Sequence, residues 1–179
     1  IDFETAFNYS WQVYSGTCGS LNSVYCRTGD GSFTLNNPLT AGQDFYIRVF
    51  RALNFQTGNF NICAWEPATP SNDSCIQAHA LSVGSSCNVD TFANYGCTSN
   101  PAEASNPTCG AYAGYDIWFK AQVPASGKLR FESVGLNGFI NSLEFLTGSC
   151  GSFTKLKCIT LNEDAYNIHN PALAGQWIY

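Results

Sequence analysis

Hydrophobic and polar residues alternate with a period of two in several short stretches of this chain. Residues 117–123 and 128–133 are the clearest cases, and residues 11–13 and 143–145 follow the same pattern. Such alternation places one set of side chains in a core and the other in solvent, as in a half-buried β-strand. In the first stretch the apolar face is made by Ile117, Phe119, Ala121 and Val123.

Glycine-containing turn sequences separate these predicted strands, for example at residues 28–31 and 124–127. Many short strands joined by such turns predict an all-β fold, a β-sandwich of the jelly-roll or immunoglobulin-like class. The one helical candidate is residues 71–81, where Ser71 or Asn72 would cap a turn or two.

The chain also repeats itself. Residues 14–21 reappear as residues 146–153, with Cys18 and Cys150 at an offset of 132 positions (150 − 18). Cys26 and Cys158 share that offset (158 − 26). A fixed offset of this size indicates two copies of one module.

The repeat predicts a domain organisation. Residues 1–66 are expected to be the later part of one β-sandwich module, and residues 71–179 the first and middle parts of the next. Residues 67–70 form a connector whose prolines, Pro67 and Pro70, favour an extended, semi-rigid link. We therefore expect tandem modules, each with other copies of itself as neighbours in a longer chain.

Composition narrows the class of protein. Nine cysteines in 179 residues, with only 12% charged residues, are typical of an oxidising compartment and so of a secreted or extracellular protein. A formal net charge of −5 with 8 scattered Lys and Arg argues against a nucleic-acid partner. Apolar runs of a few residues predict no membrane span.

Several motifs resemble a known family. Residues 72–75, 106–110, 116–120, 123–127 and 147–152, in this order, are similar to a cysteine-containing module of large secreted and surface proteins of Bacteroidota. These proteins use type IX secretion, and the module is akin to pre-peptidase C-terminal β-sandwiches. The resemblance implies a non-catalytic structural or adhesive repeat that mediates binding or spacing at the cell surface. The alternative is an accessory substrate- or carbohydrate-binding domain of a secreted hydrolase such as a protease.

The cysteine spacing suggests specific crosslinks. Cys26 follows Cys18 by eight positions, and Cys158 follows Cys150 by the same number, which we interpret as two local disulfides that each close a hairpin. Zinc binding is the alternative. Structural zinc sites require closed tetrahedral sets of Cys and His ligands, however, and no Cys-x-x-Cys pair occurs in the sequence.

The remaining cysteines are assigned by position in the module. Cys87 with Cys109 is a plausible third bridge, and Cys75 is expected to pair with a late cysteine equivalent to Cys63, beyond Tyr179. By the same logic Cys63 pairs with a residue before Ile1. Cys97, where the family pattern leads us to expect a small residue, has no assigned partner.

Catalysis is not expected. The histidines, His79 and His169, have no counterparts in the other copy, and the sequence pairs neither of them with a nucleophile that it could activate as a base. We therefore interpret both as surface residues. No carboxylate pair stands out for glycosidase chemistry.

Two kinds of ligand site remain. Asp73 and Asp116 are candidate calcium ligands, although a role as hydrogen-bond acceptors in turns is favoured because no dense acidic loop is present. Trp118, with Tyr115 nearby, is a candidate to stack on a glycan or to meet a surface protein. The alternative for Trp118, that it packs under a neighbouring loop, is favoured because strand aromatics usually stabilise their own sheet.

Overall fold

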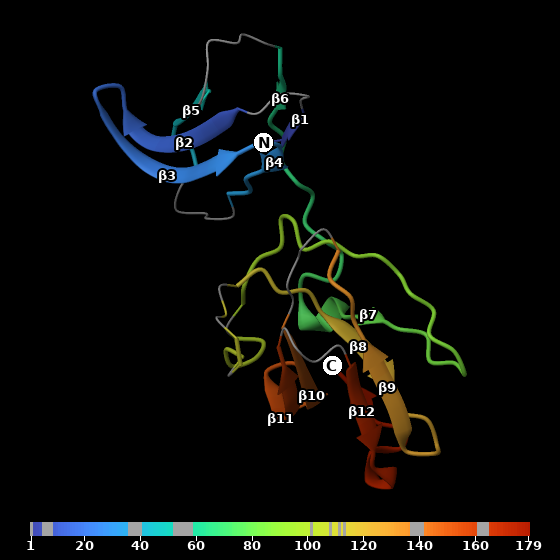
Figure 1. The fold of residues 1–179 in the computed structure, drawn as a ribbon. Helices are drawn as coiled ribbons and strands as arrows, with labels where there is room; N and C mark the ends of the chain where they lie inside the picture. The colour runs from blue at the N-terminus through green and yellow to red at the C-terminus, as the bar shows by residue number, and fades with distance from the viewer. Residues whose placement is uncertain are drawn as a thin grey trace. The chain divides into compact units, whose positions relative to one another are not determined.

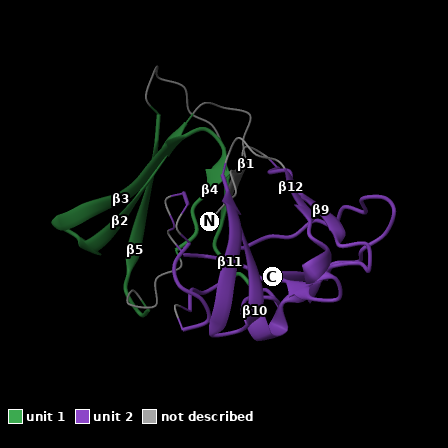
Figure 2. Ribbon diagram, turned by 90° about the horizontal axis from the view of Figure 1, so that it is seen from below, with its two compact units in different colours: residues 1–67 green, residues 68–179 purple. Residues whose placement is uncertain are grey.

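The structure is a computed structural model of the chain, and it divides into two compact units, unit 1 (1–67) and unit 2 (68–179) (Figure 2). The division falls inside the predicted connector. The residues that the structure describes are 2–4, 9–35, 41–51, 59–100, 102–107, 109–110, 112, 114–136, 142–160 and 165–179.

Unit 1 contains two three-stranded sheets (Figure 1). In the first, β2 (Ser10–Thr17) lies between β3 (Ser20–Thr28) and β5 (Phe45–Phe50), and both neighbours are antiparallel to it. In the second, β1 lies between β4 and β6. The bounds of these strands are Asp2–Glu4 for β1, Gly31–Ser32 for β4 and Asn61–Cys63 for β6.

The core of unit 1 is small and aromatic. Trp11 and Val13 are fully buried on one face of β2, as their alternation predicts. Tyr25 packs on Trp11 with ring centroids 5.3 Å apart, and Phe33 stacks on Tyr25 at 4.9 Å. One face of the β2 hairpin is therefore well covered, although β3 is exposed along almost its whole length.

Unit 2 contains a five-stranded sheet of order β11-β10-β13-β8-β7 and a two-stranded sheet of β12 and β9. All pairs are antiparallel except β7 with β8. The strands are β7 (His79–Ala80), β8 (Phe119–Gln122), β9 (Lys128–Glu132), β10 (Leu143–Ser149), β11 (Ser152–Ile159), β12 (Ala165–His169) and β13 (Trp177–Ile178).

The core of unit 2 draws on both of its sheets. It includes Ala121 from β8, Leu129 from β9, Phe145 from β10 and Ile178 from β13, all less than a tenth exposed. The strands expected at 117–123 and 128–133 are thus confirmed. The helical candidate at 71–81 is a single 3-10 turn, Cys75–Gln77, whose N-cap is Ser74 without a side-chain cap.

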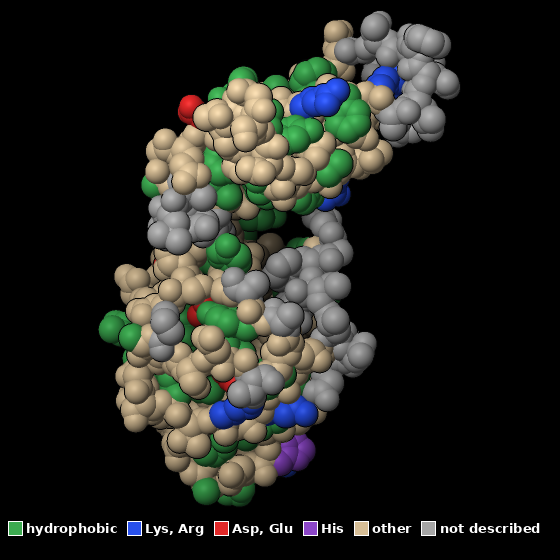
Figure 3. All heavy atoms as spheres, turned by 90° about the vertical axis from the view of Figure 1, so that its left-hand side faces the viewer, with side chains coloured by type: hydrophobic (Ala, Val, Ile, Leu, Met, Phe, Trp, Pro, Cys, Tyr) green, Lys and Arg blue, Asp and Glu red, His purple; other side chains and the backbone are tan. Residues whose placement is uncertain are grey.

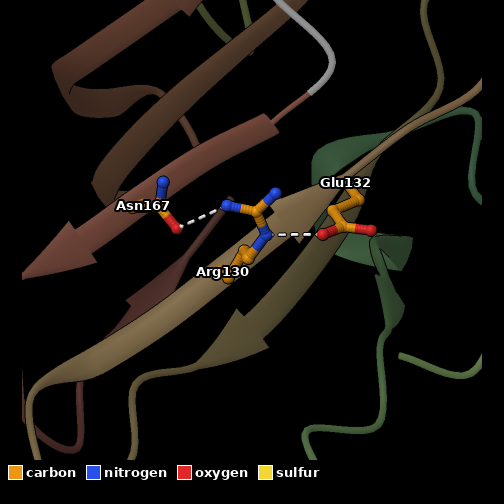
Figure 4. A network of polar contacts seen from close by, with 3 residues as sticks. All are labelled: Arg130, Glu132 and Asn167. Carbon is orange, nitrogen blue, oxygen red and sulfur yellow. Dashed lines mark hydrogen bonds and ion pairs between the residues drawn. The ribbon is translucent and has the colours of Figure 1, made fainter. Parts of the chain in front are cut away.

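An exposed polar network joins β9 to β12. Arg130 donates to the carboxylate of Glu132 on its own strand and to Asn167, its cross-strand neighbour on β12, at 3.0 Å (Figure 4). Because the Arg130 and Glu132 side chains are about half exposed, water screens the pair and it adds little stability. Its contribution is to orient side chains across the two strands.

The β2–β3 and β10–β11 hairpins have the same internal geometry. Each contains a register shift at equivalent places, between Val13 and Tyr14 and between Phe145 and Leu146. Gly16 and Gly148 have φ of +106° and +109°, and a Cβ on either would lie 2.5 Å from a backbone oxygen, of Ser20 and Ser152 respectively. Glycine is therefore required at both positions.

The disulfides differ from those that the spacing suggested. Cys75 is joined to Cys150, with Cα atoms 5.8 Å apart, and Cys109 to Cys158, with Cα atoms 5.9 Å apart. The predicted bridges Cys150–Cys158 and Cys87–Cys109 are wrong, as is the expectation that Cys75 pairs beyond Tyr179. Cys18, Cys26, Cys63 and Cys87 are exposed free thiols, and Cys97 is a buried one.

The hairpin register explains why the local bridges do not form. Cys18 lies in the β2–β3 turn, whereas Cys26 is opposite Gln12, six residues back along the partner strand. At about 3.3 Å per residue, the two cysteines are roughly 20 Å apart, far beyond the Cα separation of about 7 Å that a disulfide tolerates. The predicted Cys18–Cys26 bridge is therefore wrong, and the same register separates Cys150 from Cys158.

Candidate functional site

Trp118 is packed against its own module. Its ring stacks on Phe153 of β11 with centroids 5.5 Å apart and planes at 18°, and Phe153 in turn contacts Tyr179 at 5.1 Å. Its backbone is also held, because the Trp118 carbonyl accepts from the Asn72 side chain and from the His79 amide, both at 3.0 Å. The indole N–H is buried without a partner. These contacts match the favoured alternative, in which Trp118 stabilises the module.

Tyr115 lies in a loop cluster around the buried thiol of Cys97. Tyr115 has φ of 67°, an unusual value for a residue other than glycine. Its backbone is held in place by two contacts, because its amide donates to Ser99 Oγ and its carbonyl accepts from the Asn94 side chain, both at 3.0 Å. The Cys97 thiol in turn contacts the Asn94 carbonyl at 2.7 Å.

Both predicted calcium ligands, Asp73 and Asp116, face this same cluster. Asp73 accepts from the backbone amide of Thr98 at 2.6 Å and from its hydroxyl at 2.7 Å, and Asp116 accepts from the Tyr112 hydroxyl at 2.7 Å. Both oxygens of Asp73 are therefore occupied by protein donors. Nowhere in the described part of the chain do three or more His, Cys, Asp or Glu residues gather as a metal site would require.

The electrostatics of the cluster favour neutral groups. Burial, reinforced by the negative charges of Asp73 and Asp116, raises the pKa of the Cys97 thiol from 9.0 to about 11. Burial and the hydrogen bond to Asp116 raise the pKa of Tyr112 from 10.0 to about 12. A protonated thiol is a poor nucleophile and a poor metal ligand, so Cys97 acts as a packing residue here.

The two histidines do not form a catalytic unit. His79 on β7 packs edge-on against Phe92 and Phe119, with centroids 5.0 Å and 6.3 Å away. His169 lies on β12, where its cross-strand partner is Lys128. Neither contact provides a nucleophile for the imidazole to activate.

An open groove of about 720 Å³ lies in unit 2. Its walls combine the segment after β7, the turn between β8 and β9 and the strand β13. This volume is in the range of small-molecule and cofactor sites. The lining residues are Leu81, Val83, Gln122, Val123, Pro124, Ala125, Ala174, Gly175 and Trp177.

Trp177 is the prominent side chain of this groove. It is 39% exposed, whereas its neighbour Ile178 is buried, because successive residues of β13 point to opposite faces. The Lys120 ammonium lies over the Trp177 ring at 5.5 Å, and the Gln122 side chain donates to the Gly175 carbonyl at 2.9 Å. An exposed indole beside an amide and an ammonium offers both a flat apolar surface and hydrogen-bond donors.

Sequence reasoning selected Trp118 and missed Trp177. Both tryptophans are in or beside short strands, and composition does not distinguish them. A usable signal was present, since alternation at Trp177 and Ile178 already places the two side chains on opposite faces of a strand. What the sequence did not reveal is that Phe153 covers Trp118.

The surface carries no dense charge on the face that Figure 3 shows, where a few charged side chains stand among apolar and uncharged polar ones. None of the helical segments in the described part of the chain has the length and apolarity of a membrane-spanning helix.

Comparison with known proteins identifies the family. A profile described as galactose binding domain-like, of a group associated with type IX secretion, matches residues 71–172. No curated protein and no solved structure matches the chain. The match identifies a binding-type domain of β-sandwich architecture and no catalytic domain, and with the two disulfides it indicates a secreted protein. Because the matched region covers more than half of the sequence, the chain belongs to the type IX secretion-associated family of galactose-binding-domain-like modules.

Proposed function

We propose that this chain is a non-catalytic adhesive and spacing module of a cell-surface protein, with a glycan as the ligand of the Trp177 groove. The observation that carries the proposal is the exposed indole of Trp177 at the edge of an open groove. Sugar rings present apolar C–H faces that stack on aromatic rings, and their hydroxyls pair with donors such as Gln122 and Lys120. The family description as galactose binding domain-like supports a glycan as the ligand class.

The spacing role is supported by the connector between the units. Residues 64–70 form no helix or strand, contain Pro67 and Pro70, and include the point at which the chain divides into its two compact units. Repetition of such units in a Bacteroidota surface protein would extend the chain outward. Several weak glycan sites on one chain would then act together, because linked sites raise the effective concentration of one another.

The test is glycan binding by the full chain and by its Trp177→Ala variant. Galactose and galactose-terminated oligosaccharides are the first probes, measured by calorimetry and on a glycan array. Loss of a stacking tryptophan should weaken binding about tenfold, since a stacked aromatic contact contributes up to about 1.5 kcal/mol.

Trp65→Ala is the matched control. Trp65 is 56% exposed in unit 1, outside the groove, so its removal should leave glycan affinity unchanged. Equal loss in both variants would indicate nonspecific aromatic contact. Absence of binding by the unaltered chain to every glycan would reject the ligand and leave the spacing role.

A further inference from the structure

Equivalent residues of the two hairpins differ in whether anything covers them. Leu21 and Val24 on β3 are 40% and 43% exposed. Their equivalents at the 132-residue offset are Phe153, which Trp118 covers, and Leu156, which packs against the core of unit 2. Unit 1 therefore exposes apolar side chains at two positions whose equivalents in unit 2 are packed, one of them against Trp118 of residues 71–123.

The sheets differ at the corresponding edge. In unit 1, Phe45 of β5 is opposite Ser15 of β2. In unit 2, Ile178 of β13 is opposite Thr147 of β10, which is the residue equivalent to Ser15 at the 132-residue offset. β5 and β13 therefore pair with their hairpins in the same register. In unit 2 the far side of β13 pairs with β8, where Ile178 is opposite Ala121. No strand in the described part of unit 1 pairs with the far side of β5. The peptide groups on the far side of β5 therefore form a free sheet edge, to which another strand can pair.

The cysteines of the two hairpins differ in the same way as the side chains and the strand edge. In unit 2, Cys150 and Cys158 are each bonded to a cysteine from the first half of the module, Cys75 and Cys109. Cys18 and Cys26, at the equivalent positions of unit 1, are exposed free thiols that the hairpin register keeps apart. Three kinds of observation, namely side-chain exposure, an open strand edge and free thiols, thus point to one occupant.

We propose that unit 1 is the docking partner of a segment with the strand and cysteine pattern of residues 71–123, the first half of another module of this family. That segment adds its β8-like strand to the free edge of β5 and covers Leu21 and Val24. Its Cys75-like and Cys109-like residues form disulfides with Cys18 and Cys26. For each bridge, two thiols release two protons and two electrons to a small-molecule disulfide, which is reduced to two thiols.

The second sheets of the two units agree with this assignment. β1 and β9 align at an offset of 128 (Phe3 with Phe131), and each pairs with a strand that follows its hairpin, β4 or β12. In unit 1, β1 also pairs with β6. The two units therefore share the hairpin sheet and the second sheet of one module. Unit 2 also contains the equivalents of the early strands, β7 and β8, and unit 1 also contains the late strand β6. The proposal does not depend on glycan binding.

The test extends the full chain rather than shortening it. A second copy of residues 68–128 is placed directly before Ile1, because Ile1 aligns with Leu129 at the 128-residue offset. The protein is refolded in a buffer of oxidised and reduced glutathione and mapped by mass spectrometry of non-reduced peptides. We expect Cys18 to be bonded to the added copy of Cys75, and Cys26 to the added copy of Cys109.

A matched control carries the same extension with its copies of Cys75 and Cys109 replaced by Ser. In this control, and in the unextended chain, Cys18 and Cys26 should be alkylated rapidly by iodoacetamide, and in the extended chain that alkylation should be lost. A Cys18–Cys26 bond in any of the three proteins would overturn the proposal.

Amide hydrogen exchange tests docking without relying on the bridges. The amides of β5 should exchange more slowly in both extended proteins than in the unextended chain, since strand addition protects an edge. Unchanged exchange, with Cys18 and Cys26 still free in the extended chain, would also overturn the proposal.

Discussion

The β2–β3 and β10–β11 hairpins share a sequence pattern, a register shift and a glycine with positive φ, yet they differ in almost everything that depends on their surroundings. β3 is exposed along its length, whereas β11 ends in the buried Ile159 and contributes Phe153 and Leu156 to contacts with the rest of unit 2. A hairpin's internal geometry is thus set by its own residues. Its burial and crosslinks are set by the segment packed on it.

The largest expected difference concerns the cysteines. Replacing Cys75 and Cys150 by Ser removes a bridge between residues 75 positions apart, which should cost unit 2 about 4 kcal/mol of unfolding free energy in the chain-entropy model. Replacing Cys18 and Cys26 by Ser should change unit 1 by less than about 0.5 kcal/mol, since both are exposed and free.

Differential scanning calorimetry of the two double variants checks this prediction. The unit 2 transition should move to lower temperature in the first variant only. A comparable loss in the second would mean that Cys18 and Cys26 already stabilise unit 1.

The next prediction compares how much the side-chain packing on each hairpin contributes to stability. Phe153→Ala removes the stack on Trp118 and the contact with Tyr179, and should destabilise unit 2 by about 2 kcal/mol. The matched change Leu21→Ala on β3 should cost less than about 1 kcal/mol, because that side chain is already 40% exposed and has less contact area to lose. Urea unfolding of both variants measures the difference, and equal costs would show that Leu21 is covered after all.

The last effect is an alkaline one in unit 2. The pKa of Cys97 is about 11 in the folded protein against an ordinary 9.0, so the unfolded chain loses this proton first as the pH rises. The stabilising contribution of the protonated thiol is complete below pH 9 and is lost between about pH 9 and pH 11. The raised pKa of Tyr112 adds a similar loss at higher pH.

Urea unfolding from pH 8 to pH 11 checks the alkaline prediction, with Cys97→Ala as the reference. The unaltered chain should lose stability relative to this variant over that range. Parallel curves for the two proteins would show that Cys97 titrates normally in the folded state.

Much of the fold followed from the sequence by itself. Alternation located the strands β8 and β9 and the fully buried Trp11 and Val13, because strand periodicity is a local property of the chain. The repeated motif around Cys18 and Cys150 indicated two similar hairpins, and the shared register shift and glycines bear out that similarity. The family motifs likewise indicated the type IX secretion-associated group that the profile match identifies.

Tertiary structure decided which cysteines pair and which tryptophan is exposed. Equal spacing suggested Cys150–Cys158, but the antiparallel register carries Cys158 away from the turn and toward Cys109, while Cys75 reaches Cys150. Trp118 and Trp177 read alike in sequence, and packing against Phe153 covers only the first. Both outcomes depend on contacts between residues far apart in the chain, and local spacing contains no information about which distant segment packs on a given strand.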